Sequence, residues 1–143
     1  MPKSTTWCND LLKGTLQAVP IANMFDNAVS APLTNLYVAL CESDPGIGGS
    51  QLTGEVGYTG YARVAVARTA GGWAVTGAVG DNVGQIQFGK CTALPTTATH
   101  ITIGTASSGA GKVLYAGELD DPQGIPLNVI PIIEAGLLDV VEA

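Results

Sequence analysis

The chain contains few side chains that could do chemistry. Its single histidine, His100, lies in an alternating stretch in which Ile101 and Ile103 share one face, so His100 is expected on the other. No serine or cysteine has the spacing or context to pair with this histidine as a nucleophile. We therefore predict a packing or surface role for His100. We also predict no catalytic residue, so the chain is expected not to be an enzyme.

Three acidic residues, Glu42, Asp44 and Glu55, lie in or beside a glycine-rich loop. Paired carboxylates can hydrolyse glycosides when they face a cleft, and carboxylates combined with backbone carbonyls can bind calcium. The loop has no EF-hand or nonapeptide calcium motif, so a solvated loop is the simpler interpretation. We predict no metal ion and no cofactor.

Residues 104–112 have the glycines and the lysine of a phosphate-binding loop, but not its spacing. Gly104 and Gly111 are one residue too far apart, and Val113 stands where serine or threonine should follow Lys112. A strand-like run follows in place of a helix. The segment is therefore predicted to be a hairpin loop.

Three aromatic residues, Tyr58, Tyr61 and Trp73, could form an exposed platform for a sugar or a partner chain. The alternative is that aromatic rings on neighbouring strands form a packing pair. The three cysteines are widely spaced and match neither a zinc site nor a CxxC redox pair, which favours buried, reduced thiols.

Residues 6–19 predict a short helix. Thr6 can cap it, and Pro20 ends it. One apolar stripe follows helical spacing and consists of Cys8, Leu11, Leu12, Leu16 and Val19. A second apolar group could add a helical turn or an irregular arm, and consists of Ile21, Met24, Phe25 and Val29. We assign residues 1–32 to an N-terminal helix or arm.

The rest of the chain consists of short strand-like runs separated by turn residues. Strands are predicted within 36–41, 62–67, 85–88, 100–103, 113–116 and 137–141. Turn residues between them include Gly71-Gly72, Asp81-Asn82, Ser107–Gly109 and Asp120–Pro122. This spacing predicts a mainly β fold, an antiparallel, jelly-roll-like sandwich that forms a single domain over residues 33–143.

Composition narrows the classes of partner. The chain has 143 residues, a net charge of −6 and no basic patch, so nucleic-acid binding is not expected. No apolar run approaches the roughly 20 residues that span a bilayer, and no signal-peptide core is present, so we expect synthesis in the cytoplasm and no membrane partner. Charged residues make up only 13%, which favours a protein whose surface is covered in an assembly.

Several short motifs connect the chain to a known family. The most specific lie at 36–40, Asp44-Pro45-Gly46, Glu55 and 60–63, and later ones at Phe88, 99–101, 103–104, 114–117 and 136–138. With these motifs the chain, over residues 8–141, resembles the small virion proteins of tailed bacteriophages that are grouped as tail fibre or tail accessory proteins. The resemblance implies a non-enzymatic structural role in the virion. We also expect self-association, and partners among the major capsid protein or the tail proteins of the same virion.

Two uses on the particle stay open. A capsid-surface decoration or cement subunit is favoured because no heptad or other repeat could build a fibre shaft. Leu11, Leu12 and Leu16 of the arm would then contact a neighbouring subunit. Cys8 could form an inter-subunit disulfide once particles leave the reducing cytoplasm, unless it is simply packed on the helix stripe.

The alternative is a tail fibre or tail-tip accessory protein that binds a host receptor or glycan. Its binding residues would be Tyr58, Tyr61 and Trp73.

Overall fold

The structure is a computed structural model, and it describes residues 3–20 and 32–142. These residues form two compact units, one of residues 3–20, 32–35, 67–86 and 133–142 and the other of residues 36–66 and 87–132. We call them the helix unit and the clamp unit. The predicted division into an arm of residues 1–32 and a domain of residues 33–143 stays a prediction.

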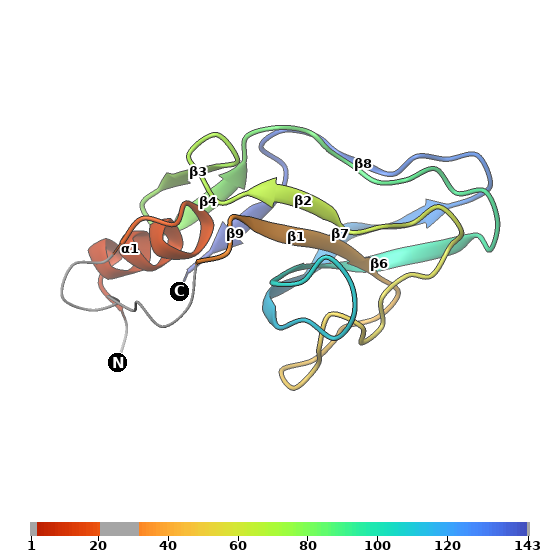
Figure 1. The fold of residues 1–143 in the computed structure, drawn as a ribbon, viewed down its shortest axis with the longest axis horizontal. Helices are drawn as coiled ribbons and strands as arrows, with labels where there is room; N and C mark the ends of the chain where they lie inside the picture. The colour runs from red at the N-terminus through yellow and green to blue at the C-terminus, as the bar shows by residue number, and fades with distance from the viewer. Residues whose placement is uncertain (1–2, 21–31, 143) are drawn as a thin grey trace. The chain divides into compact units, whose positions relative to one another are not determined.

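The fold is mainly β with antiparallel sheets and one short N-terminal helix, which confirms these parts of the predicted fold class (Figure 1). The jelly-roll-like arrangement stays a prediction. The elements of the described residues are α1 (Thr5–Leu16), β1 (Asn35–Cys41), β2 (Val64–Ala67), β3 (Trp73–Thr76), β4 (Val79–Asn82), β5 (Ile86–Gln87), β6 (Thr96–Gly104), β7 (Val113–Ile125), β8 (Ile132–Ile133) and β9 (Asp139–Val141).

The clamp unit is built on a four-stranded sheet with the order β2-β1-β6-β7. β1 pairs antiparallel with β6, and Leu40 lies opposite Ile101. Alternating apolar residues of these central strands are buried, among them Leu36, Val38 and Ile103. The predicted hairpin is confirmed, because β6 and β7 pair antiparallel and the loop 105–112 joins them.

The long strand β7 lies at an edge of this sheet. The expected turn at Asp120–Pro122 is wrong, since all three residues lie inside β7. Pro122 cannot donate to a ladder, but an edge strand has one side without a partner, so proline is tolerated there. Exposed acidic residues and proline also protect an edge against unwanted pairing.

The helix unit packs α1 against a three-stranded antiparallel sheet with the order β3-β4-β9 (Figure 1). Leu12, Leu16 and Trp73 are fully buried. The helix approaches β4 at Gly80, where an added Cβ would lie 2.6 Å from Leu16 Cδ1. The expected turn at Asp81-Asn82 is wrong, because both residues belong to β4.

The cap of α1 differs from the prediction. Ser4, not Thr6, is the N-cap, and its side chain accepts a hydrogen bond from Trp7 N. At the other end, Arg68 donates hydrogen bonds of 2.7 Å to the carbonyls of Gly14 and Thr15, groups that a helix C-terminus leaves without an intrahelical partner. The second apolar group, residues 21–29, lies outside the described residues.

Asn82 connects the end of β4 to the segment that precedes β9. Its amide donates to the carbonyls of Gly84 (2.8 Å) and Glu134 (2.9 Å), and its side-chain oxygen accepts from Leu138 N (2.9 Å). A buried asparagine with these partners is satisfied, and it holds the segment that leads into β9 against the end of β4.

Candidate functional site: a buried ion pair that fixes two loops

The clamp unit carries a long loop, residues 42–63, between β1 and β2. Its tip is shaped by local contacts. Asp44 Oδ1 accepts from Gly46 N at 2.8 Å, and Gly46 has φ +68°. An added Cβ on Gly49 would lie only 2.0 Å from the Pro45 carbonyl oxygen. The glycines are therefore required by the tight path of the backbone.

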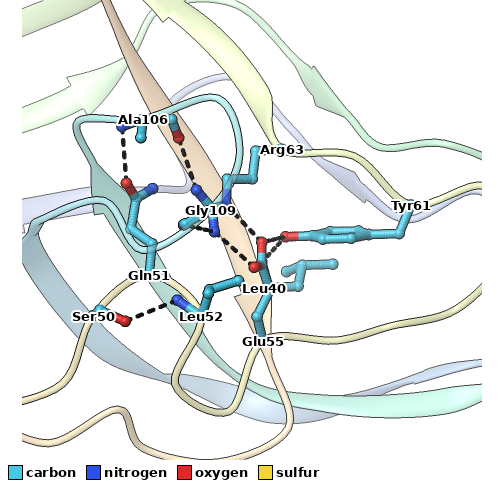
Figure 2. A network of polar contacts seen from close by, with 9 residues as sticks. All are labelled: Leu40, Ser50, Gln51, Leu52, Glu55, Tyr61, Arg63, Ala106 and Gly109. Atoms are coloured by element: carbon cyan, nitrogen blue, oxygen red, sulfur yellow. Dashed lines mark hydrogen bonds and ion pairs between the residues drawn. The ribbon is translucent and has the colours of Figure 1, made fainter.

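Glu55 and Arg63 form a bidentate ion pair at the base of this loop (Figure 2). Arg63 Nε lies 2.7 Å from Glu55 Oε1, and Arg63 Nη2 lies 2.7 Å from Glu55 Oε2. The two side chains are only 2% (Arg63) and 11% (Glu55) exposed. A paired, bidentate geometry is what makes burial of two charges tolerable. Hydrogen bonding to Glu55 raises the pKa of Arg63 further above its usual range.

Arg63 also reaches the second loop, residues 105–112. Its Nη1 donates to the Ala106 carbonyl at 2.9 Å and its Nη2 to the Gly109 carbonyl at 2.8 Å. One guanidinium therefore connects the loop 42–63 to the hairpin loop (Figure 2). The five donors of arginine in a rigid plane suit this use.

Tyr61 ties the ion pair to the sheet. Its hydroxyl donates to Glu55 Oε1 at 2.9 Å and accepts from the backbone N–H of Leu40 in β1 at 3.2 Å. Burial raises the pKa of Tyr61, and the charge of Glu55 raises it further. The hydroxyl is therefore held as a neutral donor between the sheet and the loop.

Gln51 makes a second connection between the loops. It is fully buried; its Oε1 accepts from Ala106 N and its backbone N–H donates to the Gly111 carbonyl, each at 2.9 Å. Gly104 and Gly111 leave space for the side chain, because an added Cβ on Gly104 would lie 2.1 Å from Gln51 Cδ. We call Glu55, Tyr61, Arg63 and Gln51 the loop clamp.

The loop clamp holds groups in place, although one of its buried atoms, Gln51 Nε2, has no hydrogen-bond partner. Both oxygens of Glu55 accept hydrogen bonds from Arg63 or Tyr61, so this carboxylate is not a free base or an open ligand. Among the described residues, no group of three or more potential ligands could hold a metal ion. Glu42 and Asp44 therefore do not combine with Glu55 into the calcium site considered above.

The register brings Cys41 opposite His100, a pairing that the sequence did not indicate. Burial raises the pKa of Cys41 to about 11, so the thiol is held in its protonated form. His100 Nδ1 lies 2.8 Å from Thr99 Oγ1. This geometry favours a packed thiol and not an activated nucleophile.

The aromatic residues pack in the interior. Tyr58 and Tyr61 meet edge to face at 5.4 Å, and Tyr61 stacks on Phe88 at 6.1 Å. The Tyr58 hydroxyl donates to the Gly89 carbonyl. Trp73 is fully buried in the helix unit. The prediction of an exposed platform is wrong for Tyr58 and Trp73, because both side chains are buried. Partner binding by Tyr58, Tyr61 and Trp73 stays a prediction.

The N-terminal candidates contribute to the core of the helix unit. Cys8, Leu12 and Leu16 are buried and Leu11 is half-buried. These positions favour packing on the helix stripe. Contact with a neighbouring subunit, and a disulfide through Cys8, stay predictions.

We expect the Tyr61 hydroxyl to make stability depend on alkaline pH. The pKa of Tyr61 is raised in the folded state. The hydroxyl therefore makes its full contribution to the free energy of unfolding below about pH 10, the ordinary tyrosine pKa, and this contribution is lost progressively as the pH rises above that value. Tyr61→Phe should lose about 1 kcal/mol at neutral pH and flatten the dependence above pH 10. Urea unfolding at a series of pH values measures both, and an unchanged slope would contradict the assignment.

We expect all three thiols to be protected in the folded protein. Cys8, Cys41 and Cys91 are buried, and the raised pKa of Cys41 disfavours its thiolate. A chromogenic disulfide reagent near pH 8 should find no rapidly reacting thiol in the native chain and 3 after denaturation. Rapid native reaction that Cys8→Ser abolishes would instead show Cys8 to be accessible to a partner.

Comparison with known proteins gives one family. A family model described as podophage GP4 fiber I protein gp80 matches residues 12–141. No curated protein matches the sequence. No helix in residues 3–20 and 32–142 is both long and apolar enough to cross a membrane. The match covers most of the chain and confirms the resemblance to fibre-like virion proteins. The chain therefore belongs to the podophage GP4 fiber I protein gp80 family, a family of bacteriophage virion structural proteins.

Proposed function

We propose that this chain is a non-enzymatic structural subunit of a podophage fibre, which acts through contacts with other proteins of the virion. The observation that carries the proposal is the family match over residues 12–141, because the description of that family names a fibre protein. A fold by itself does not establish a function. The loop clamp must therefore also be consistent with the proposed role.

The loop clamp is consistent with a role in holding a binding surface ready for a neighbouring protein. Glu55, Tyr61, Arg63 and Gln51 make hydrogen bonds that fix two loops to one sheet. A buried ion pair is weak evidence for net stability, and in some proteins such pairs specify one arrangement over others, which is the role we propose for this one. A surface that must fit a neighbour gains affinity when it is held in its bound shape before contact.

The clamped loop displays apolar side chains to solvent. Ile47 at its tip is fully exposed, and Leu52 is 55% exposed. Single exposed apolar residues are ordinary, but a tip isoleucine on a braced loop is suited to insertion into a neighbour's surface. We propose this loop as a contact of the subunit within the virion.

A capsid-surface decoration or cement subunit is the second candidate. The content of charged residues, 13%, favours a surface that is covered by neighbours, and no shaft-forming repeat is evident. Such a subunit would bridge capsid proteins and add contacts that expansion of the shell must break. We place it second because the family description names a fibre.

A tail-tip protein that binds a glycan is a weaker candidate. It would need exposed ring faces, and Tyr58 and Trp73 are buried. Self-association and the identity of the partner proteins belong to the same proposal and are tested with it.

Quantitative mass spectrometry of gradient-purified particles tests the proposal. We expect the chain to be present at a fixed copy number in wild-type particles. Particles made without it should have altered or missing fibres and intact, DNA-filled heads. Absence of the chain from particles would overturn a virion role, and unstable heads with normal fibres would favour the cement role.

A further inference from the structure

Within the described part of the helix unit, one face of the three-stranded sheet carries mostly exposed side chains. In the antiparallel register Val79 lies opposite Val141, and Asp81 lies opposite Asp139. Residues two apart on a strand share a face, so these two pairs lie side by side. On β3 their neighbours are Thr76 and Ala74, both exposed.

The opposite face of the same sheet is the packed one. Gly80 and Val140 pair with each other and are buried, and Gly80 lies against Leu16 of α1. Val79 and Val141 are by contrast 36% and 62% exposed. Two more exposed aliphatic residues, Val83 and Leu137, lie just beyond the ends of β4 and β9. We call Val79, Asp81, Asp139 and Val141, with Ala74 and Thr76, the open face.

The open face carries two acidic residues, Asp81 and Asp139, that lie directly opposite each other, and none of its six residues is basic. The nearest described cation along β9 is Lys3, which is paired with Glu142. Burial raises the pKa of Asp81, and hydrogen bonding and charge repulsion from Asp139 raise it further. The neighbours on β3 are not titratable, and α1 packs on the other side of the sheet. Like charges directly opposite each other on neighbouring strands are destabilising. A cation brought by another molecule would remove this repulsion.

We propose that the open face is a docking surface for another virion protein that presents a lysine or arginine flanked by aliphatic side chains. The cation would lie between the carboxylates of Asp81 and Asp139, and the aliphatic groups would cover Val79 and Val141. Charged groups of opposite sign fix the register of an interface. The aliphatic side chains around them contribute apolar surface that is buried in the contact. The inference rests on the proposed role as a virion subunit and names the chemistry of one partner.

Charge complementarity also decides against a second copy of this chain as the occupant. A symmetric contact places the same patch on both sides, so it would bring four carboxylates together at neutral pH. Such juxtaposition of like charges is strongly unfavourable. The occupant is therefore a different, basic surface.

A charge-reversal variant tests the proposal in the phage that encodes the chain. Asp139→Lys should lower the number of copies per purified particle at least about tenfold, because it places a cation against the partner's cation. Asp120→Lys, with the same charge change on the exposed edge strand β7, should leave the number unchanged. Thermal unfolding of both purified variants checks that the fold is kept.

A photo-crosslinking side chain at position 137 then identifies the contact in assembled particles. We expect the crosslinked peptide to come from another virion protein and to contain lysine or arginine beside aliphatic residues. A peptide of this chain itself, a peptide without a basic residue, or normal incorporation of Asp139→Lys would overturn the proposal. The proposed function is tested separately, because the presence of the wild-type chain in particles is measured without any substitution. A failure of the docking proposal can therefore be told from a failure of the proposed function.

Discussion

Replacement of Glu55 by glutamine is expected to lower the free energy of unfolding by about 3 kcal/mol, close to the low end for removal of one partner of a buried ion pair. Glutamine keeps the size of the side chain and one carbonyl oxygen. Its NH₂ group, however, would face Arg63 Nη2, a donor opposite a donor, at the position where the two groups now lie 2.7 Å apart. The guanidinium, only 2% exposed, would then be an uncompensated buried charge.

Urea unfolding followed by tyrosine fluorescence measures this loss of stability. The signal reports on the clamp unit, which contains Glu55 and Arg63, because all four tyrosines belong to that unit. Glu118→Gln is the matched control, because Glu118 is exposed on β7. It should change the unfolding free energy by less than about 0.5 kcal/mol. Equal stability of Glu55→Gln and wild type would show that the ion pair does not hold the loops.

The second large effect is expected from Trp73→Ala, with a loss of about 3–5 kcal/mol. Trp73 is the largest of the fully buried side chains. Its carbonyl also accepts from Gln17 Nε2 at 2.9 Å, just beyond the end of α1. Removal of the indole would leave a cavity under α1 that the surrounding residues could fill only in part.

Both tryptophans of the chain belong to the helix unit, so the remaining Trp7 reports its unfolding by fluorescence. Val79→Ala on the open face is the control and should have a small effect. A Trp73→Ala protein as stable as wild type would contradict the buried position. A change in host adsorption by this variant would have to be separated from its loss of stability before it could indicate receptor binding.

Periodicity was sufficient to predict the helix and the central strands, although the cap was placed at Thr6 and not at Ser4. Leu12 and Leu16 fall on one helical stripe, and both are buried against the sheet of the helix unit. Alternation in 36–41 and 100–103 predicted the paired strands β1 and β6. These signals are local, so a single sequence contains them.

Features that depend on distant partners could not be predicted. Asp81-Asn82 and Asp120–Pro122 have turn composition but lie in strands, because tertiary pairing overrides local preference. The Glu55–Arg63 pair joins residues on either side of a loop segment, and Arg63 also needs the carbonyls of a hairpin some forty residues later. A charged residue at the start of an otherwise apolar strand was the one available hint.

Electron microscopy of the intact particle at subunit resolution would show directly whether the chain is part of a fibre. We expect the four-stranded sheet β2-β1-β6-β7 and its clamped loops to fit density in a fibre, with the loop 42–63 against a neighbouring subunit. Density for this chain on the capsid shell would contradict the fibre assignment. Particles with complete fibres and no density for the chain would contradict its role as a fibre subunit altogether.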